Sequence, residues 1–203
     1  MVPRDFVIGF IRDHEGGLSM RPDDNGNWTG GARGLGHLVG SKFGVTAAAL
    51  ARHRGTIPSK ITASMMANLT IQEAADIGLS IYFTGTGFDK LPWDRVVASI
   101  FDMSWGAGPK QTAKLVQRMI GAKDDGVFGP ASQRAYLDWR SARSEAQAAL
   151  EWANRRNAFY EQIAANEGAN DPDRFFLKGW RNRTNSFLPQ TAWWGGWNET
   201  RQA

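Results

Sequence analysis

Three residues near the N-terminus have types and a spacing that suit acid–base chemistry. Glu15 is followed at once by two glycines, Asp24 comes nine positions after it, and Thr29 comes five positions after Asp24. Cleavage of a glycosidic bond uses one protonated carboxyl group and one ionised carboxylate, and a nearby hydroxyl could hold the attacking water. The same residues also have an ordinary interpretation, because Asp is common in turns and a Glu before glycines can end an exposed helix.

A helix is predicted to carry the first of these residues. Apolar side chains recur at helical intervals over about residues 5–15, at Phe6, Val7, Phe10 and Ile11. Gly16 and Gly17 would end this helix, which places Glu15 on its last turn. There the helix dipole disfavours the anionic form of the carboxyl group, and partial burial would act in the same direction. A carboxyl group that stays protonated near neutral pH can act as a general acid.

A turn is predicted to bring the other two residues back towards Glu15. The Pro-Asp-Asp-Asn-Gly stretch that contains Asp24 is rich in turn-forming residues. A reversal there would place Asp24, ionised in polar surroundings, and Thr29 opposite Glu15. We expect a short β-hairpin in this glycine-dense part of the chain, with residues 28–29 and 43–45 as its strands.

The sequence resembles the glycoside hydrolase 108 family in three motifs. They are His-Glu-Gly-Gly at 14–17, Asp-Asn-Gly-Asn-Trp-Thr-Gly-Gly at 24–31 and Lys-Phe-Gly-Val-Thr at 42–46. The family consists of phage and prophage endolysins that act as N-acetylmuramidases. The resemblance therefore implies a mainly α, lysozyme-like helical fold with a small β-hairpin or loop region after the first helix. An insert over 30–41 separates the last two motifs, as in a longer branch of the family.

The resemblance also implies a reaction, hydrolysis of the β-1,4 bond between N-acetylmuramic acid and N-acetylglucosamine in peptidoglycan glycan strands. Glu15 would protonate the leaving oxygen, Asp24 would stabilise the cationic transition state or activate water, and Thr29 would position that water. Asn27 and Trp28 are predicted substrate-binding residues, with the Trp28 ring as a platform for a sugar. Two alternatives stay open: a lytic transglycosylase, which uses one Glu and no water, and a non-catalytic peptidoglycan-binding protein.

The remainder of the chain reads mainly as helices. Their predicted ranges are 47–54, a short helix ending near 68, 70–83, 93–105, 111–121, one opening at 131, 144–166 and a closing helix over 175–183. The helix over 93–105 is the most apolar, so we expect it at the centre of the core. Asp102 lies in it beside the apolar face. It could support the cleft, but the sequence favours a hydrogen-bonded structural acid.

A second resemblance lies in the C-terminal half. Gln117 followed by Asp-Gly-Val-Phe-Gly-Pro at 125–130 is similar to the core of peptidoglycan-binding helical repeats, although the same residues would suit an ordinary turn between helices. We predict a single lysozyme-like domain over 1–203, with a catalytic part over 1–92, a helical part over 93–190 that resembles a peptidoglycan-binding segment, and a Trp-rich tail over 191–203. The tail, with Trp193, Trp194 and Trp197, could contact sugars or fold onto the core.

Composition narrows the remaining functional classes. With 42% hydrophobic residues, 22% charged residues and a net charge of +4, the chain reads as globular with a mild basic bias. It lacks the Lys/Arg stripe expected of a nucleic-acid groove, so we expect no nucleic-acid partner. There is no Cys, and His14, His37 and His53 show no metal-ligand spacing, so neither a metal nor another cofactor is expected.

The sequence also allows a prediction of how the protein reaches its substrate. No apolar run approaches the length of a membrane span, and the N-terminal residues do not resemble a signal peptide. Endolysins of the resembled kind often wait in the host bacterial cytoplasm until a holin partner lets them reach the periplasm and cell wall. We expect the same of this protein. We also expect it to be a monomer and to have no stable membrane insertion.

Overall fold

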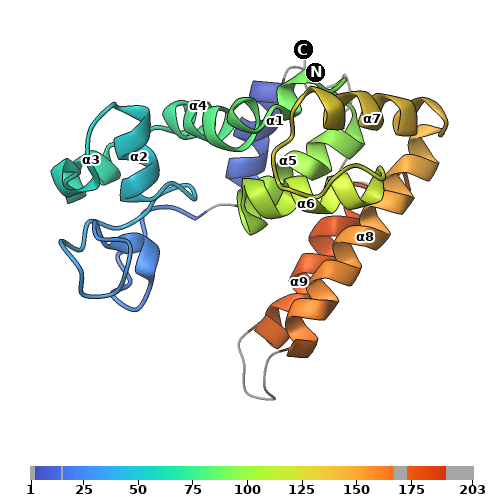
Figure 1. Ribbon diagram of the computed structural model, residues 1–203. Coiled ribbons are helices and arrows are strands. Elements are labelled where there is room, and N and C mark those ends of the chain that lie inside the picture. The colour runs from blue at the N-terminus through green and yellow to red at the C-terminus, as the bar shows by residue number, and fades with distance from the viewer. Residues whose placement is uncertain (1–2, 15, 167–172, 191–203) are drawn as a thin grey trace, which may run out of the picture. The chain divides into compact units, whose positions relative to one another are not determined.

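Helices dominate the computed structural model, which describes residues 3–14, 16–166 and 173–190 (Figure 1). The predicted mainly α, lysozyme-like class is confirmed. The chain divides into two compact units, Met1–Gly85 and Thr86–Ala203. The predicted single domain with parts at 1–92 and 93–190 stays a prediction, and the Trp-rich tail lies outside the described residues.

The first unit is organised by two helices that pack together, α1 and α4. Its described helices are α1 Pro3–His14, η1 Asn25–Asn27, α2 Ala47–His53, η2 Pro58–Lys60, α3 Ala63–Ala67 and α4 Ile71–Tyr82. The apolar stripe of α1 is fully buried, at Phe6, Val7, Phe10 and Ile11. An ion pair of 2.8 Å between Arg4 Nε and Asp76 Oδ1 links the same two helices. The amphipathic helix predicted before Gly16 is therefore confirmed.

Threonine side chains begin three helices of this unit. Thr46, Thr62 and Thr70 precede α2, α3 and α4, and each Oγ1 accepts a hydrogen bond from the backbone N–H three residues on, at 3.4, 3.2 and 3.1 Å respectively. Such caps satisfy one of the N–H groups that a helix start leaves unpaired. The Glu73 carboxylate, which a capping box would direct to Thr70, accepts from Arg54 Nε and Nη2 and so connects α4 to the end of α2.

The loop between α1 and α2 differs from the predicted hairpin. In its described part, Trp28 forms its antiparallel bridge with Leu38, and Lys42 pairs with Val45 in a tight turn. The predicted pairing of strand 28–29 with strand 43–45 is therefore wrong. The partner of Trp28 comes from the insert, because the insert turns back on itself through glycines with positive φ, Gly31, Gly34, Gly36 and Gly40. For residues with a Cβ, that backbone conformation is less stable by about 1 kcal/mol or more.

The second unit is built around α5. Its described helices are η4 Phe88–Lys90, α5 Arg95–Ala107, α6 Pro109–Met119, α7 Pro130–Ser141, α8 Glu145–Asn166 and α9 Asp173–Asn185, and η3 Thr84–Thr86 lies at the boundary between the units. Every residue of α5 from Val96 to Ser104 is buried, as predicted for the most apolar helix. This helix packs against α6 and α8, and α9 runs beside α8 (Figure 1).

A buried glutamine holds the turn between α6 and α7. The side chain of Gln117 donates through Nε2 to Asp125 Oδ1, Val127 O and Ser132 Oγ at 3.0–3.1 Å. Its Oε1 accepts from the backbone N–H of Gly126 at 2.9 Å. One side chain thus satisfies polar groups across the whole turn, which explains the spacing between the glutamine and the Asp-Gly motif.

Candidate active site

The sequence motifs of the first unit meet in the loop between α1 and α2. The backbone N–H of Phe43 donates to the carbonyl of Gly16 at 3.1 Å, and Ser19 and Ser41 exchange two backbone hydrogen bonds of 2.8 and 3.0 Å. Phe43 holds a positive φ of 54°, which is uncommon for a bulky residue. Glu15 itself lies outside the described residues, so its role as general acid stays a prediction.

Asp24 stands on the surface of this loop as the N-cap of η1. Its Oδ1 accepts a hydrogen bond of 2.8 Å from the backbone N–H of Gly26. A Cβ at position 26 would lie 3.3 Å from Asp24 Oδ1 and 3.1 Å from Thr46 Cγ2, so the glycine lets the second and third motifs approach closely. One carboxylate oxygen is therefore fixed by the turn, while the side chain as a whole remains exposed to solvent.

Thr29 is almost buried, with 7% of its surface exposed. Its backbone N–H donates to the carbonyl of His37, and its Oγ1 accepts from the backbone N–H of His37, both at 2.9 Å. Gly36 covers the hydroxyl so closely that a Cβ there would lie 2.3 Å from Thr29 Oγ1. A hydroxyl has two acceptor positions and one proton, so this arrangement leaves one acceptor position and the proton for another group.

Asn27 and Trp28 lie between these two residues and support the loop. Asn27 is fully buried, and its Nδ2 donates to Arg21 O at 2.9 Å and Ser19 Oγ at 3.3 Å. The indole Nε1 of Trp28 donates to Pro22 O at 3.0 Å, and the residue keeps part of its surface exposed. The structure thus gives Asn27 a role in holding the loop, and direct sugar contacts by either residue stay predictions.

A different set of polar residues lies in the second unit. Asp102 on α5 is 1% exposed and accepts hydrogen bonds from Arg156 Nη2 on α8 and, at 2.8 Å, from Arg183 Nε on α9. Arg156 Nη1 also donates to the Ser99 carbonyl at 3.2 Å and to Ser99 Oγ at 3.1 Å. Trp152 Nε1 donates to the same Ser99 hydroxyl at 3.0 Å. Asp102 is therefore hydrogen-bonded and structural, as the sequence favours.

The charged groups of this network keep one another ionised. Burial pushes the pKa of Asp102 upward, but the guanidinium groups of Arg156 and Arg183 more than offset that effect and hold the pKa below its usual range. Burial lowers the pKa of Arg156, but Asp102 and Tyr160 outweigh burial, so the pKa is raised overall. Both groups of the buried pair therefore stay ionised at neutral pH.

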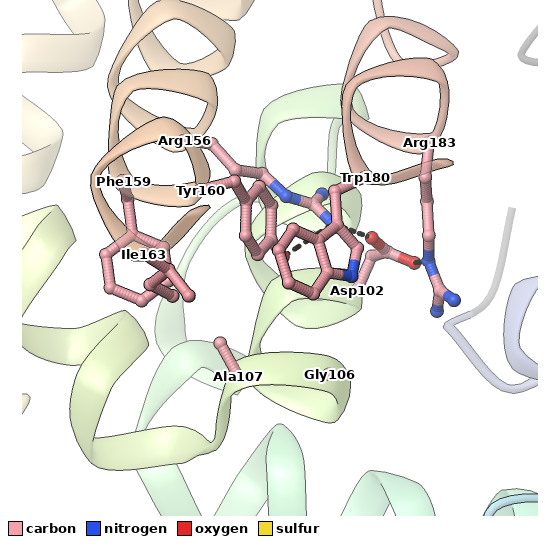
Figure 2. A pocket seen from close by; sticks show the side chains of 9 residues that line it. All are labelled: Asp102, Gly106, Ala107, Arg156, Phe159, Tyr160, Ile163, Trp180 and Arg183. Carbon is pink, nitrogen blue, oxygen red and sulfur yellow. Dashed lines mark hydrogen bonds and ion pairs between the residues drawn. The ribbon is translucent and has the colours of Figure 1, made fainter. Parts of the chain in front are cut away.

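A pocket of about 230 Å³ lies beside the network. Tyr160 and Trp180 form one wall, as a stacked pair with ring centroids 4.9 Å apart and planes inclined by 25°. Phe159, Ile163 and Ala107 supply the apolar remainder (Figure 2). Figure 2 shows the stacked rings next to the Asp102 carboxylate and its two arginine partners. The pocket therefore combines aromatic and apolar walls with a charged side.

Comparison with known protein families decides what kind of chain this is. Residues 8–108 match the family model described as glycosyl hydrolase 108, and residues 111–185 match the model described as predicted peptidoglycan domain. The chain belongs to glycosyl hydrolase family 108. It is a glycoside hydrolase with a peptidoglycan domain in its C-terminal half, which supports peptidoglycan as its substrate.

The fold of this family 108 chain is shared with a solved protein. The structure of SagA from Brucella abortus superposes with a TM-score of 0.64 and 21% sequence identity, over 93% of this chain and 97% of that chain. At this identity the similarity establishes the fold. No curated protein sequence matches the chain.

The described part of the family 108 chain contains no group of three or more His, Cys, Asp or Glu side chains that could hold a metal ion. Within the same residues, no helix combines the length and the apolar character needed to span a bilayer.

Sequence reasoning located the first-unit motifs and singled out Asp102, but it missed the arginine partners of Asp102 at the second-unit pocket. Arg156 was detectable, because it is the one charged residue in a buried stripe that repeats every four residues along α8, at Ala148, Trp152, Arg156, Tyr160 and Ala164. An arginine in such a stripe requires a buried partner. Its partner Asp102 is 54 residues away in sequence, so the pairing itself had no local signal.

Proposed function

We propose that this protein is an N-acetylmuramidase that hydrolyses the β-1,4 bond between N-acetylmuramic acid and N-acetylglucosamine. The observation that carries the proposal is the meeting of the family motifs in one loop. Phe43 N–H is hydrogen-bonded to the carbonyl of Gly16, the residue after Glu15, and Gly26 brings Asp24 next to Thr46. Residues of the types required for glycoside hydrolysis are thus attached to a single, internally hydrogen-bonded segment.

Each residue has a distinct part in the proposed reaction. Glu15 protonates the oxygen of the leaving sugar, and the exposed carboxylate of Asp24 stabilises positive charge on the sugar ring or activates water. Thr29 holds that water through the acceptor position and proton that its hydrogen bond from His37 leaves available. A held water favours inversion of configuration, for which the two carboxyl groups are about 6.5–9.5 Å apart.

Substrate binding is proposed to begin on the outer face of the same loop. The Nε1 of Trp28 is fixed by the carbonyl of Pro22, which orients the indole ring while leaving part of it exposed for a sugar. Asn27 supports that surface from beneath, through the hydrogen bonds that hold residues 19 and 21.

The biological setting is proposed from the resemblance of the motifs to endolysins. In that setting the protein is a monomeric bacteriolytic phage or prophage enzyme, which stays in the host cytoplasm until a holin opens the way to the cell wall. Lysis of host cells that depends on co-expression of a holin would support this setting.

Replacement of Glu15 by Gln tests the reaction itself. The substitution keeps the size of the side chain but removes the transferable proton, so release of reducing ends from purified cell walls should fall roughly 10³-fold. Glu73→Gln is the matched control, because Glu73 is another acid of the first unit and its partner is Arg54. It should leave the rate within about twofold, as expected for a surface ion pair. Near-wild-type activity of the Glu15 variant would end the proposal.

The products separate the proposed reaction from its alternatives. A muramidase releases muropeptides with a free reducing end, whereas a lytic transglycosylase gives a product lighter by one water, which mass spectrometry resolves. A protein that pellets with peptidoglycan and releases nothing would be a binding protein. For a hydrolase, NMR of the first-formed anomer distinguishes inversion from retention.

A further inference from the structure

The pocket between α5, α8 and α9 has a composition that suits one kind of ligand. We propose that it binds a carboxylate of the peptidoglycan stem peptide, with the apolar part of the peptide against the aromatic wall. This inference rests on the proposed function for its choice of polymer, and it assigns peptide recognition to the second unit. The pocket lies largely in the segment that matches the peptidoglycan domain, since Arg156, Tyr160 and Trp180 all fall within residues 111–185.

The lining of the pocket is positively charged. Among the described residues that line the pocket, two guanidinium groups face one carboxylate, that of Asp102. Because Asp102 is shared between Arg156 and Arg183, the lining carries an excess of positive charge. The Nε of Arg156 is buried and has no hydrogen-bond partner in the described part of the chain. An anionic ligand would compensate both the charge and the unpaired donor.

Accessibility identifies the residue that the ligand reaches first. Arg156 is fixed in the interior with 1% of its side chain exposed, whereas Arg183 keeps 27% of its side chain exposed while it contacts Asp102. Arg183 therefore sits where the buried network meets solvent. A carboxylate arriving from solvent can be recognised by this guanidinium without disruption of the Asp102–Arg156 pair.

The size and shape of the pocket suit a short ligand group. At about 230 Å³ the pocket is smaller than the roughly 300–1,000 Å³ typical of sites for larger small molecules, so it admits a short group and not a glycan strand. The Tyr160–Trp180 stack offers an apolar edge against which the alkyl groups of alanine-like residues can pack. In peptidoglycan the group that combines a carboxylate with small alkyl side chains is the stem peptide.

The test uses the wild-type full chain and purified disaccharide-tetrapeptide muropeptide, which no longer contains the bond that a muramidase cuts. Isothermal titration calorimetry should show binding of this muropeptide. Esterifying its carboxyl groups with methanol should weaken binding about tenfold or more, since a charge-assisted hydrogen bond is lost. A neutral N-acetylglucosamine oligomer should not compete for the same site. Equal affinity for the free acid and the ester would overturn the inference without any change to the protein.

Protein variants then locate the site. Arg183→Gln and Trp180→Ala should each weaken muropeptide binding roughly tenfold, and Trp180→Phe should retain most of the affinity. Arg181→Gln is the matched control, because Arg181 lies on the same helix and pairs with Glu161 outside the pocket. Its affinity should equal that of the wild type. Circular dichroism verifies that each variant is folded, and unchanged affinity in folded Arg183 and Trp180 variants would overturn the inference.

The two proposals fail separately. Loss of muropeptide binding in the pocket variants, together with an absence of hydrolysis by the wild-type chain, would refute the muramidase proposal and support the pocket. Hydrolysis that requires Glu15, together with equal binding of the free acid and the methyl ester, would support the muramidase proposal and refute the pocket.

Discussion

The two units hold the polar residues of their candidate sites by different physical means. In the loop of the first unit, Asp24 and Thr29 are fixed by hydrogen bonds with nearby backbone groups, at Gly26 and His37. In the second unit, Asp102 is fixed by charged side chains from α8 and α9, which lie 54 and 81 residues away in sequence. The first arrangement depends on the shape of one segment, and the second depends on the packing of three helices.

This difference predicts where each unit is sensitive. A loop held by backbone hydrogen bonds should be disturbed most by changes that alter its backbone conformation. A buried ion-pair network should be disturbed most by removal of one partner, because the remaining charge is left in the interior. Matched substitutions in the two units test this contrast.

Asp102→Ala should destabilise the second unit by about 3–5 kcal/mol, because it leaves the buried guanidinium of Arg156 without its counter-ion. The matched change in the first unit is Asp76→Ala, which breaks a pair with Arg4 whose side chains are 43% and 47% exposed. That change should cost far less, because solvent screens an exposed ion pair and leaves it little net stabilisation. Urea unfolding of both variants measures the difference, and similar costs would contradict the contrast.

Gln117→Ala should destabilise the turn between α6 and α7 by about 2–3 kcal/mol, because the buried Ser132 hydroxyl and the half-buried Gly126 N–H lose their partner. Gln133→Ala, in the next helix, removes a side chain of the same type outside this hydrogen-bond set and serves as the control. Thermal unfolding followed by circular dichroism should show a lower Tm for the first variant. An unchanged Tm would mean that the turn does not need the glutamine.

Gly36→Ala should distort the loop around Thr29, because the new Cβ would lie 2.3 Å from the threonine hydroxyl. Gly34→Ala is a close control, since both glycines have a φ of 77° but a Cβ at position 34 would meet nothing within 4 Å. We expect a cost of about 2 kcal/mol at position 36 and about 1 kcal/mol at position 34. Cell-wall hydrolysis should fall at least tenfold more at position 36, and equal rates would remove Thr29 from the site.

Mild acidification should change the stability of the second unit least, because Asp102 stays ionised until the pH is low. The pKa of Asp102 is lower in the folded protein than in the unfolded chain, so the stability it contributes is fully present above about pH 4 and is lost as the pH falls through the folded pKa. Urea midpoints of the wild type and of Asp102→Ala should therefore differ by a constant amount from pH 7 to pH 5 and converge below pH 4. A difference that already shrinks above pH 5 would contradict this sign.

The first unit was the more predictable from sequence because its signals are local. The apolar stripe at Phe6 and Phe10, the glycines after Glu15 and the cap at Thr46 each act within a few residues, and each feature predicts its element directly. The strand partner of Trp28 could not be predicted in the same way. Its choice between Leu38 and residues 43–45 depends on how the insert folds back through its glycines.

The pocket of the second unit shows more clearly which contacts a sequence does not predict. The sequence favours a structural role for Asp102, but nothing near it indicates that Arg156 and Arg183 are its partners. Those contacts require α8 and α9 to pack beside each other and against the core, which is a property of the whole unit. Long-range ion pairs of this kind are visible in sequence only as charged residues at buried helix positions.

Thr46 shows how one residue can connect the architecture of the first unit to its chemistry. Its oxygen starts α2 by accepting from Ala49, while its methyl group borders Gly26 in the turn of Asp24. Serine would preserve the oxygen and lose the methyl group, and valine would do the opposite. Helix initiation and the placement of the Asp24 carboxylate are therefore coupled at this position, because only threonine meets both requirements with one side chain.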